Sequence, residues 1–406
     1  MAEFLSGEFS ADQKIKILFA TRSLSTGGGE RLVSRLVNSL ASDTEPIVLV
    51  MKREIAYKVG CRVYLASVGL GSGIFYRIGS IFKYAVNIRQ VIRKERPDVI
   101  LGSLIILSFS IFLGLSPNRI KRRSVYFPST NPFESIHSDL SFIMKLVTIY
   151  EAVVIVLIAN LGWIVFPSSY LLRKYRSFHL PLKNAGTIRY FVDPTELLAL
   201  ASDQPSEWPR DPVIISVGRL APEKNHALLI RAFVKVRAAV RCKLMIVGSG
   251  ELNHILHELS ESLNVREDVM MLGQQENPFK FIARSKMLVL SSNFEGMPTS
   301  LIEAMTLGIP VVATDCEGCK EIIGRRNKAG IIVPRNDVAA LADAILSLLQ
   351  DEKLRESYAT LARKRSLNFA PSHIRPSYLS LIRKVGGQRN TDDVSRLIGD
   401  FSTTPR

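Results

Sequence analysis

The sequence predicts an α/β protein with two doubly wound, Rossmann-like domains. Apolar runs of strand length alternate with helical patterns, and this alternation stops and then starts again once along the chain. A chain of 406 residues is also too long for a single core, and its 47% hydrophobic content is enough to bury two. We therefore expect two parallel sheets, each with helices on both faces.

The first domain is expected over residues 15–195, after a flexible leader at 1–14. The apolar run Ile15–Thr21 predicts the first strand, and three glycines at 27–29 join it to a helix that ends near Leu40. The leader has acidic residues and no basic region followed by an apolar core, so it is not typical of a signal peptide. The remaining predicted elements are strands at 47–50, 62–66, 98–101 and 124–127 and a helix at 75–94.

An unusually apolar segment at 142–166 has two interpretations. Glu151, Asn160 and Gly162 interrupt it, so too few continuous apolar residues remain to span the ~30 Å of a bilayer core. A buried helix followed by a strand is therefore favoured. A helix lying on a membrane surface, next to the basic clusters described below, stays open as the alternative.

The second domain is expected over residues 213–370. A composition rich in Asp, Gln, Pro, Ser and Glu at 196–212 predicts a linker, after which strands and helices alternate again. We expect the helix at 371–385 to return to the first domain and the polar tail at 386–406 to be disordered. A strand and its following loop are predicted at 213–220, and the other predicted strands of this domain lie at 243–247, 269–272, 287–290, 310–313 and 330–333.

The net charge of +16 is concentrated in the first half of the chain. Residues 1–195 contain 25 basic and 13 acidic side chains, hence +12 of the total. The basic clusters at 119–123 and 173–176 suit phosphates of nucleic acid, an anionic membrane or a lipid-linked substrate. The sequence has neither interleaved aromatic and basic residues nor zinc-finger spacing, so we expect no nucleic-acid partner.

The four cysteines indicate a reducing compartment, because they are too scattered for a disulfide framework. Cys316 and Cys319 form one CxxC motif. Zinc would require a second pair at suitable spacing, and a redox pair would require a helix N-terminus, for which the segment from Lys320 onward is the candidate. We interpret the motif as part of a loop beside the binding cleft.

Residues 287–323 contain the pattern that points to chemistry. Glu295 follows the predicted strand at 287–290, and Glu303 lies in the helix that begins after Pro298, so the two carboxylates flank a strand-to-helix turn. Ligands of open α/β sheets bind at such turns, and the free N–H groups of a new helix favour an anion. This indicates a phosphorylated substrate. In the alternative interpretation, Glu295 merely caps the turn and Glu303 is solvated.

Two more loops are expected at the same edge of the second sheet. GRLAPEKN contributes Arg219 and Lys224, and VGSGE contributes Gly248 and Gly250. Arginine and lysine suit a diphosphate, whereas carboxylates accept hydrogen bonds from hydroxyls. Together these residue types predict a sugar-nucleotide site, although each cation alone is more typical of solvated surface.

The second domain resembles the C-terminal half of family 4 (GT4) retaining glycosyltransferases of the GT-B fold. The resemblance rests on the Glu-x7-Glu spacing of Glu295 and Glu303, and it extends through VGRLAPEKN, IVGSGE, LGQQENP, the stretch to VVATDC, and KEII, with GGGER in the first half. It is strongest for bacterial enzymes that transfer hexoses or N-acetylhexosamines onto lipid-linked saccharides. It implies two facing Rossmann-like domains, the first binding the acceptor and the second the nucleotide sugar.

The resemblance also implies roles for individual residues. Arg219 and Lys224 would hold the donor diphosphate, Glu295 would bond hydroxyls of the donor sugar, and Glu303 would bond the ribose. The donor would be a UDP-sugar, and no metal or other cofactor would be needed. The remaining donor-binding positions would be Gly28, Gly29, Gly248, Gly250, Gly296, Met297, Pro298 and Thr299.

The acceptor side is less defined by the sequence. The family often has a basic residue or histidine near the sugar, and Asn131 or His137 in the loop after 127 are the candidates, although a lone loop histidine is more often solvated. Two departures, Tyr190–Phe191 where the family has Asn-Gly and Thr299 where it has Asn, affect fine donor contacts.

We expect a cytoplasmic enzyme, peripheral at the inner face of the plasma membrane, that glycosylates a lipid-linked or growing saccharide. One alternative is a soluble glycosyltransferase that acts on a small molecule or a protein. The other is a non-catalytic protein that binds a sugar nucleotide or nucleic acid.

Overall fold

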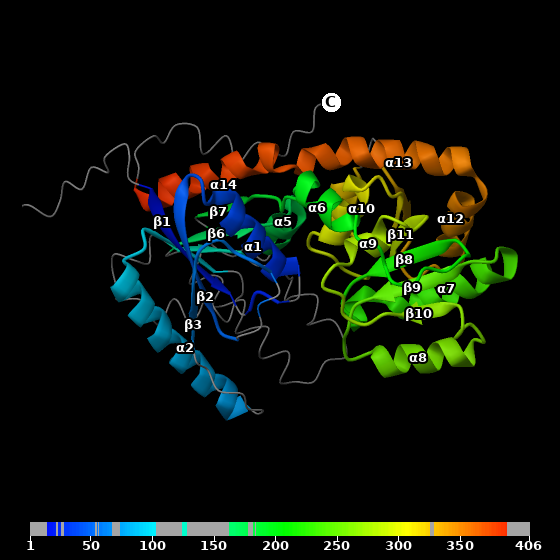
Figure 1. The fold of residues 1–406 in the computed structure, drawn as a ribbon, viewed down its shortest axis with the longest axis horizontal. Coiled ribbons are helices and arrows are strands. Elements are labelled where there is room, and N and C mark those ends of the chain that lie inside the picture. The colour runs from blue at the N-terminus through cyan, green and yellow to red at the C-terminus, as the bar shows by residue number, and fades with distance from the viewer. Residues whose placement is uncertain are drawn as a thin grey trace, which may run out of the picture. The chain divides into compact units, whose positions relative to one another are not determined.

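The computed structural model divides the chain into two compact units (Figure 1). The N-terminal unit contains residues 1–189 and 374–406, and the C-terminal unit contains residues 190–373. The structure describes residues 14–21, 23–25, 28–52, 55, 57–66, 74–102, 124–127, 162–177, 182, 184–324 and 329–387.

The N-terminal unit is built on a seven-stranded sheet in which every pair of neighbouring strands is parallel. The strand order is β3-β2-β1-β4-β5-β6-β7, so the chain adds strands first on one side of β1 and then on the other. This confirms the predicted doubly wound fold. The strands are β1 (Ile15–Thr21), β2 (Thr44–Val50), β3 (Arg62–Leu65), β4 (Val99–Gly102), β5 (Ser124–Tyr126), β6 (Trp163–Phe166) and β7 (Ala185–Thr187).

Helices cover the sheet because alternate strand residues point to opposite faces and both sets are apolar. Leu18 and Ile47 pack against Tyr84 and Ile88 of α2. Ile15 lies instead beside Gly386 at the end of α14. The helices of this unit are α1 (Gly28–Leu40), α2 (Ile74–Glu95), α5 (Ser169–Ser177) and α14 (Pro371–Gly386), whose first residues still belong to the C-terminal unit.

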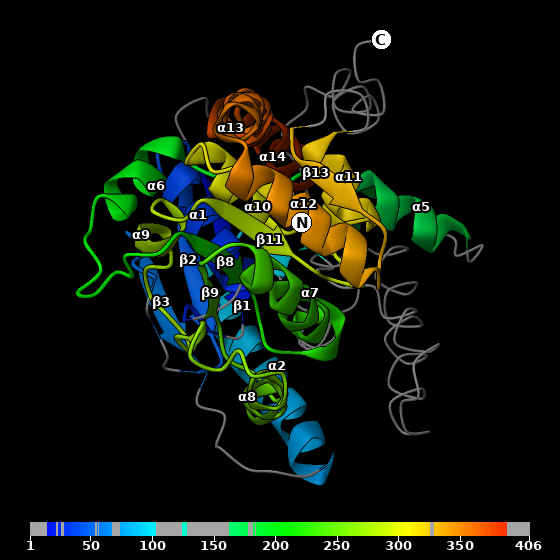
Figure 2. The same cartoon turned by 90° about the vertical axis from the view of Figure 1, so that its right-hand side faces the viewer.

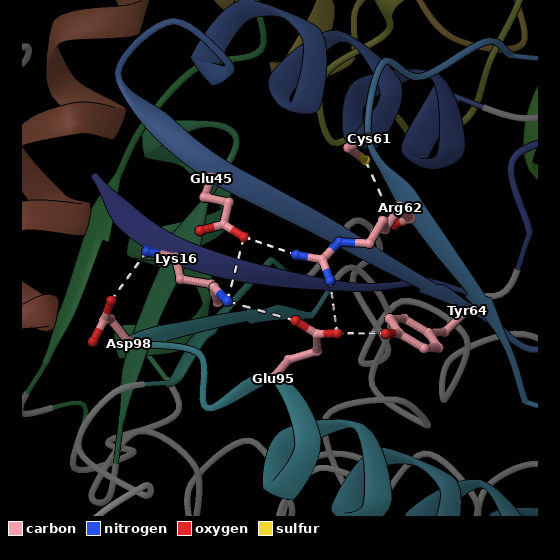
Figure 3. Close-up of polar contacts among 7 residues, drawn as sticks. All are labelled: Lys16, Glu45, Cys61, Arg62, Tyr64, Glu95 and Asp98. Carbon is pink, nitrogen blue, oxygen red and sulfur yellow. Dashed lines mark hydrogen bonds and ion pairs between the residues drawn. The ribbon is translucent and has the colours of Figure 1, made fainter. Parts of the chain in front are cut away.

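A polar cluster ties the end of α2 to the amino ends of β1, β2 and β3 (Figure 3). The Glu95 side chain is only 4% exposed and forms ion pairs with Arg62 Nη1 at 3.2 Å and Lys16 Nζ at 3.5 Å. Tyr64 donates a hydrogen bond to it, and Glu45 pairs with the same two cations. The Tyr64 bond and the two cations lower the pKa of Glu95 against the opposing effect of burial.

The C-terminal unit has a second fully parallel sheet, of six strands, in the order β10-β9-β8-β11-β12-β13. The order reverses at β8, which lies between β9 and β11. The point between β8 and β11 is thus the topological switch point, where open α/β sheets bind their ligands. The strands are β8 (Val213–Val217), β9 (Lys243–Val247), β10 (Val269–Met271), β11 (Met287–Leu290), β12 (Val311–Thr314) and β13 (Ile331–Val333).

Helices lie on both sides of this sheet (Figures 1 and 2). Met287 and Val289 of β11 face the cluster formed with α7, α8 and α12, whereas Leu288 and Leu290, between and beside them, are buried outside that cluster. α10 contacts β11 and β12 and packs with α9 and α11. The helices of this unit are α6 (Pro194–Ala201), α7 (His226–Ala239), α8 (Asn253–Ser262), α9 (Phe279–Ile282), α10 (Thr299–Thr306), α11 (Glu317–Ile323), α12 (Val338–Gln350) and α13 (Glu352–Ser366).

The predicted linker at 196–212 differs from the structure at its start. α6 extends to Ala201 inside the C-terminal unit, and the boundary between the units falls at 189/190. The helix forms because Pro194 fits its first turn and the Asp193 side chain accepts hydrogen bonds from the next backbone N–H groups. Asn277 Nδ2 then donates to Leu200 O at 2.7 Å, which holds this segment on the unit.

Among the described helices, none combines the length and the apolar character needed to cross a bilayer. Most of the apolar segment at 142–166 lies outside the described residues, and its last four residues form β6, as predicted. The basic cluster at 119–123 also lies outside them, whereas Arg173, Lys174 and Arg176 belong to α5.

Candidate active site

Two charged side chains meet at the switch point of the C-terminal sheet. Lys224 follows β8 and Glu295 follows β11, and the Lys224 Nζ to Glu295 Oε1 distance is 2.5 Å. Their side chains are 22% and 8% exposed, so water screens the pair weakly. Ser292 Oγ donates a second hydrogen bond to the same oxygen at 2.8 Å. The structure thus brings together two of the residues that the sequence predicted for this site.

The loop after β8 is fixed to the loop after β11. Asn225 adopts the left-handed conformation at φ 45°, and its side chain accepts from Leu228 N while its Nδ2 donates to Asn293 Oδ1 at 3.1 Å. The backbone adds a bond from Asn293 N to Glu223 O at 2.8 Å. Because these contacts hold both backbones, Lys224 and Glu295 face each other without loop rearrangement.

The pair offers both kinds of group that a sugar nucleotide needs. A lysine ammonium has three N–H donors, of which one points to Glu295, so the others suit phosphate oxygens. Both contacts to Glu295 within the described part of the chain fall on Oε1, so Oε2 is suited to accept from a hydroxyl. A buried, paired charge is also pre-oriented, since turning it away would leave its partner uncompensated.

Arg219 lies in the same loop but does not join the pair in this structure. Its side chain is 67% exposed and forms an ion pair with Glu223, four residues later. Burial acts to raise the pKa of Glu223, but the bond from Arg219 and a backbone hydrogen bond outweigh it and lower that pKa. To hold a diphosphate, the guanidinium would have to share or leave Glu223.

The turn between Glu295 and α10 has a free helix start. Pro298 is the N-cap and provides no side-chain hydrogen bond, so the first N–H groups of α10 suit an anion. The Met297 side chain is buried, and its Sδ accepts from Tyr190 N at 3.3 Å, so only its backbone suits a ligand. Thr299 begins α10, and Glu303 lies within it, 2% exposed, and is therefore not the solvated residue of the alternative interpretation.

Three glycines allow the loops of this edge to approach one another. A Cβ on Gly248, whose φ is +149°, would lie 1.9 Å from Gly218 O, and one on Gly250 would lie 2.3 Å from Leu220 O. A Cβ on Gly318, in α11, would lie 2.3 Å from Glu295 O and 2.9 Å from Gly296 O. Close packing between segments therefore explains why glycine is needed at these positions, whether or not a ligand binds there.

The remaining predicted residues lie in the N-terminal unit. Gly28 and Gly29 form the first turn of α1, and a Cβ on Gly29 would meet nothing within 4 Å. Close packing therefore does not require glycine at position 29. Asn131 and His137 lie outside the described residues.

Several residues of the site were missed at the level of sequence. Glu223 could have been found from its i,i+4 spacing to Arg219. Asn225 could have been found as a preferred N-cap residue directly before the α7 helix. Ser292 had no such signal, because serine after a strand is common. His226 is 2% exposed, and burial, together with the Lys224 charge, lowers its pKa to about 4.

Within the described ranges, no three or more His, Cys, Asp or Glu side chains gather in a way that could hold a metal ion.

Comparison with known proteins shows which chains this one is similar to. Residues 201–365 match the model of "Glycosyl transferases group 1". The Campylobacter jejuni N-acetylgalactosamine-N,N'-diacetylbacillosaminyl-diphospho-undecaprenol 4-alpha-N-acetylgalactosaminyltransferase is 37% identical over 161 residues, which are 39% of this chain and 43% of that enzyme. The chain thus spans less than half the length of this relative.

A second C. jejuni relative is matched along almost its whole length. The GalNAc-alpha-(1->4)-GalNAc-alpha-(1->3)-diNAcBac-PP-undecaprenol alpha-1,4-N-acetyl-D-galactosaminyltransferase is 25% identical over 91% of this chain and 99% of that enzyme. The structure of sucrose-phosphate synthase from Thermosynechococcus elongatus superposes with a TM-score of 0.78 over 92% of this chain and 99% of that one, at 18% identity.

Two doubly wound parallel units, with the charged pair at the switch point of the second, form the GT-B fold. The similarity to the group 1 glycosyl transferases covers residues 201–365, which lie in the C-terminal unit and make up less than half of the chain.

Proposed function

We propose that this protein transfers a hexose or N-acetylhexosamine from a UDP-sugar to a lipid-linked or growing saccharide, with retention of the anomeric configuration. The observation that carries the proposal is the Lys224–Glu295 pair at the switch point of the C-terminal sheet. Retention and the uridine base rest on the family resemblance.

Protein cations suit the leaving group of this reaction. When the bond between the anomeric carbon and the phosphate breaks, negative charge builds on the diphosphate and positive character on the sugar. Lys224, Arg219 after it turns from Glu223, and the N-terminus of α10 would stabilise that negative charge, with no metal ion or other cofactor in the proposal.

Glu295 is proposed to position the donor rather than to shuttle protons. Its Oε1 is occupied by Lys224 and Ser292, and a carboxylate held in this way is suited to orient sugar hydroxyls. Glu303, which follows it in α10, is proposed for the ribose hydroxyls on the family resemblance. Gly28 and Gly29 are proposed on the same ground to approach the diphosphate.

The lipid-linked acceptor is favoured by the C. jejuni relatives, whose names specify diphospho-undecaprenol or PP-undecaprenol saccharides. We propose that the protein meets such an acceptor as a peripheral protein at the inner face of the plasma membrane. The net charge of +16, most of it in the first half of the chain, would favour an anionic lipid surface, and no nucleic-acid partner is part of the proposal.

The activity is tested with purified protein, radiolabelled UDP-, GDP- and ADP-sugars, and a membrane lipid extract. We expect label from one UDP-sugar to enter the lipid fraction, and Glu295→Ala to remove that transfer. Transfer by the Glu295→Ala variant at the parent rate would contradict the assigned site, and no transfer from any donor would contradict the function.

The acceptor and the membrane are tested separately. Flotation with anionic liposomes should show binding at low salt that weakens at high salt, because salt screens the attraction. A protein that floats at neither salt concentration and glycosylates only water-soluble acceptors would instead be a soluble enzyme. Stabilisation by a UDP-sugar in a thermal-shift assay, without turnover, would indicate a non-catalytic binding protein.

A further inference from the structure

Two buried thiols lie in contact beside the Lys224–Glu295 pair. Cys316 is the extended N-cap of α11 and Cys319 lies in its first turn, so the two side chains reach the same side of the helix start. Their sulfurs are 2.9 Å apart, and the residues are 3% and 0% exposed. Both are free thiols. A disulfide has an S–S bond of about 2.05 Å, so closing this pair would move the sulfurs by about 0.9 Å.

The backbone between the two thiols packs directly on the donor turn. Gly318 lies between them in sequence, and even a Cβ there would lie 2.3 Å from Glu295 O and 2.9 Å from Gly296 O. The two backbones are packed closely, so a shift of the first turn of α11 must move the Glu295–Gly296 backbone. Burial raises the pKa of the Cys319 thiol, the Glu295 carboxylate adds to that rise, and the Lys224 ammonium opposes it.

We propose that Cys316 and Cys319 form a thiol-oxidation site, at which a peroxide closes the pair into a disulfide and thereby displaces the Glu295–Gly296 turn. The closing of the disulfide is independent of the proposed function, whereas its effect on sugar transfer rests on that function.

The chemistry balances with hydrogen peroxide as the two-electron oxidant. The Cys316 sulfur takes one peroxide oxygen, which gives a sulfenic acid and one water. The Cys319 sulfur then attacks the Cys316 sulfur, the S–O bond breaks, and the departing oxygen leaves as a second water with the Cys319 proton. Two thiols and one peroxide thus become one disulfide and two waters. A dithiol such as dithiothreitol reverses the reaction.

The order of the two steps follows from the surroundings of the thiols. Cys316 is the more exposed of the two. Burial, then Cys316 and Glu295, raise the pKa of Cys319, so that thiol is the less reactive of the two toward peroxide. Glu317 and Lys320, each next in sequence to one of the cysteines, line a cavity of about 460 Å³ beside α11. Burial of both sulfurs makes the reaction slow, and it therefore responds to sustained rather than brief exposure.

The test treats the purified full-length protein with hydrogen peroxide and maps the linked peptides by mass spectrometry after the remaining thiols are alkylated. We expect one Cys316–Cys319 disulfide, a smaller thermal shift with UDP, and a loss of transfer of up to about 100-fold, because a displacement near 1 Å can cost that much. Dithiothreitol should restore all three readouts.

Two variants separate the pair from other oxidation. Cys316→Ser should keep transfer activity and become insensitive to peroxide, with Cys319→Ala as the second variant if the first melts early. Cys61→Ser removes a half-exposed thiol of the N-terminal unit and should respond like the parent.

Absence of the linked peptide in the folded, oxidised parent would overturn the proposal. Equal inactivation of Cys316→Ser would also overturn it. If the untreated parent transfers no sugar, the proposed function fails, while the peptide map still decides whether the disulfide forms.

Discussion

Lys224 and Glu295 are 71 positions apart in the sequence, yet their charged groups form a 2.5 Å ion pair across the switch point of the C-terminal sheet. The pair exists because β8 and β11, which precede these residues, are neighbours in the sheet although β9 and β10 separate them along the chain.

Removing either member of the pair should lower sugar transfer strongly. We expect Lys224→Ala to reduce kcat by about 10²–10³, as for loss of one preorganised electrostatic contact to a developing negative charge. Glu295→Ala should cost a similar factor, and the double variant should lose less than the product of the two because the residues act as a unit. The assay is the initial rate of labelled sugar transfer.

A matched control comes from the residue just before β11. Lys286 is exposed and directly precedes β11, at the opposite end from Glu295, so Lys286→Ala removes an equal charge far from the site. It should transfer at the parent rate. If the kcat of the double variant fell by the full product of the two single-variant factors, the ion pair would not matter for the reaction.

Alanine at Gly248 should destabilise the C-terminal unit. Its Cβ would lie 1.9 Å from Gly218 O on a backbone with φ +149°, so the two loops must separate. We expect a loss of about 1–3 kcal/mol, the range for overpacking, measured by urea unfolding. Gly60→Ala meets nothing within 4 Å and should stay within about 0.5 kcal/mol of the parent. Equal effects of the two substitutions would remove the steric explanation.

Alanine at Gly29 should separate stability from function. The position is helical and a Cβ there meets nothing within 4 Å, so Gly29→Ala should stabilise the N-terminal unit by about 0.5–1 kcal/mol. If the diphosphate approaches this turn, the same methyl group should raise the KM for the donor. An unchanged KM in a more stable protein would remove Gly29 from the proposed donor site.

His226 should make stability depend on pH between about 6.5 and 4. Burial lowers its pKa to about 4 in the folded protein, whereas the unfolded value is about 6.5. The unfolded chain therefore binds more protons in this window, so stability is full above pH 6.5 and falls as the pH drops toward 4, by at most about 3 kcal/mol. His226→Leu should flatten this part of the curve in thermal melts at stepped pH. A slope identical to that of the parent would exclude His226 as its source.

Glu95 should make folding stability depend on pH in a more acidic range than His226 does. Its pKa is lowered, so its contribution to stability is present above the unfolded value of about 4.3 and is lost as the pH falls through the folded pKa. We expect Glu95→Gln to lose about 1.5 kcal/mol at pH 7, the lower end for a charged hydrogen bond, since Arg62 is exposed. Unfolding at pH 7 and pH 3 measures the difference, which should shrink in acid. Glu356→Gln, at an exposed helix position, is the control and should change neither value.

Much of the fold was predictable from local pattern. Continuous apolar runs such as 287–290 can only be buried strands of a parallel sheet or buried helix, and alternation with helical segments decided between these. The linker at 196–212 was misplaced at its start, because its polar composition hid the capping residue Asp193 and the helix start at Pro194. The composition of a segment indicates how well water solvates it. Helix capping depends instead on a single side chain and on the backbone conformation of that one residue.

The site was predictable only as a set of residue types. The sequence by itself determined that Glu295 and Glu303 flank a strand-to-helix turn and that Arg219 and Lys224 follow another strand, because strand ends and helix starts are local properties. Tertiary structure alone decided that Lys224 faces Glu295 while Arg219 pairs with Glu223, and that Cys316 and Cys319 lie against the Glu295 turn. These contacts depend on strand order and on the close approach of separate loops, and both are set by packing between segments far apart in the chain.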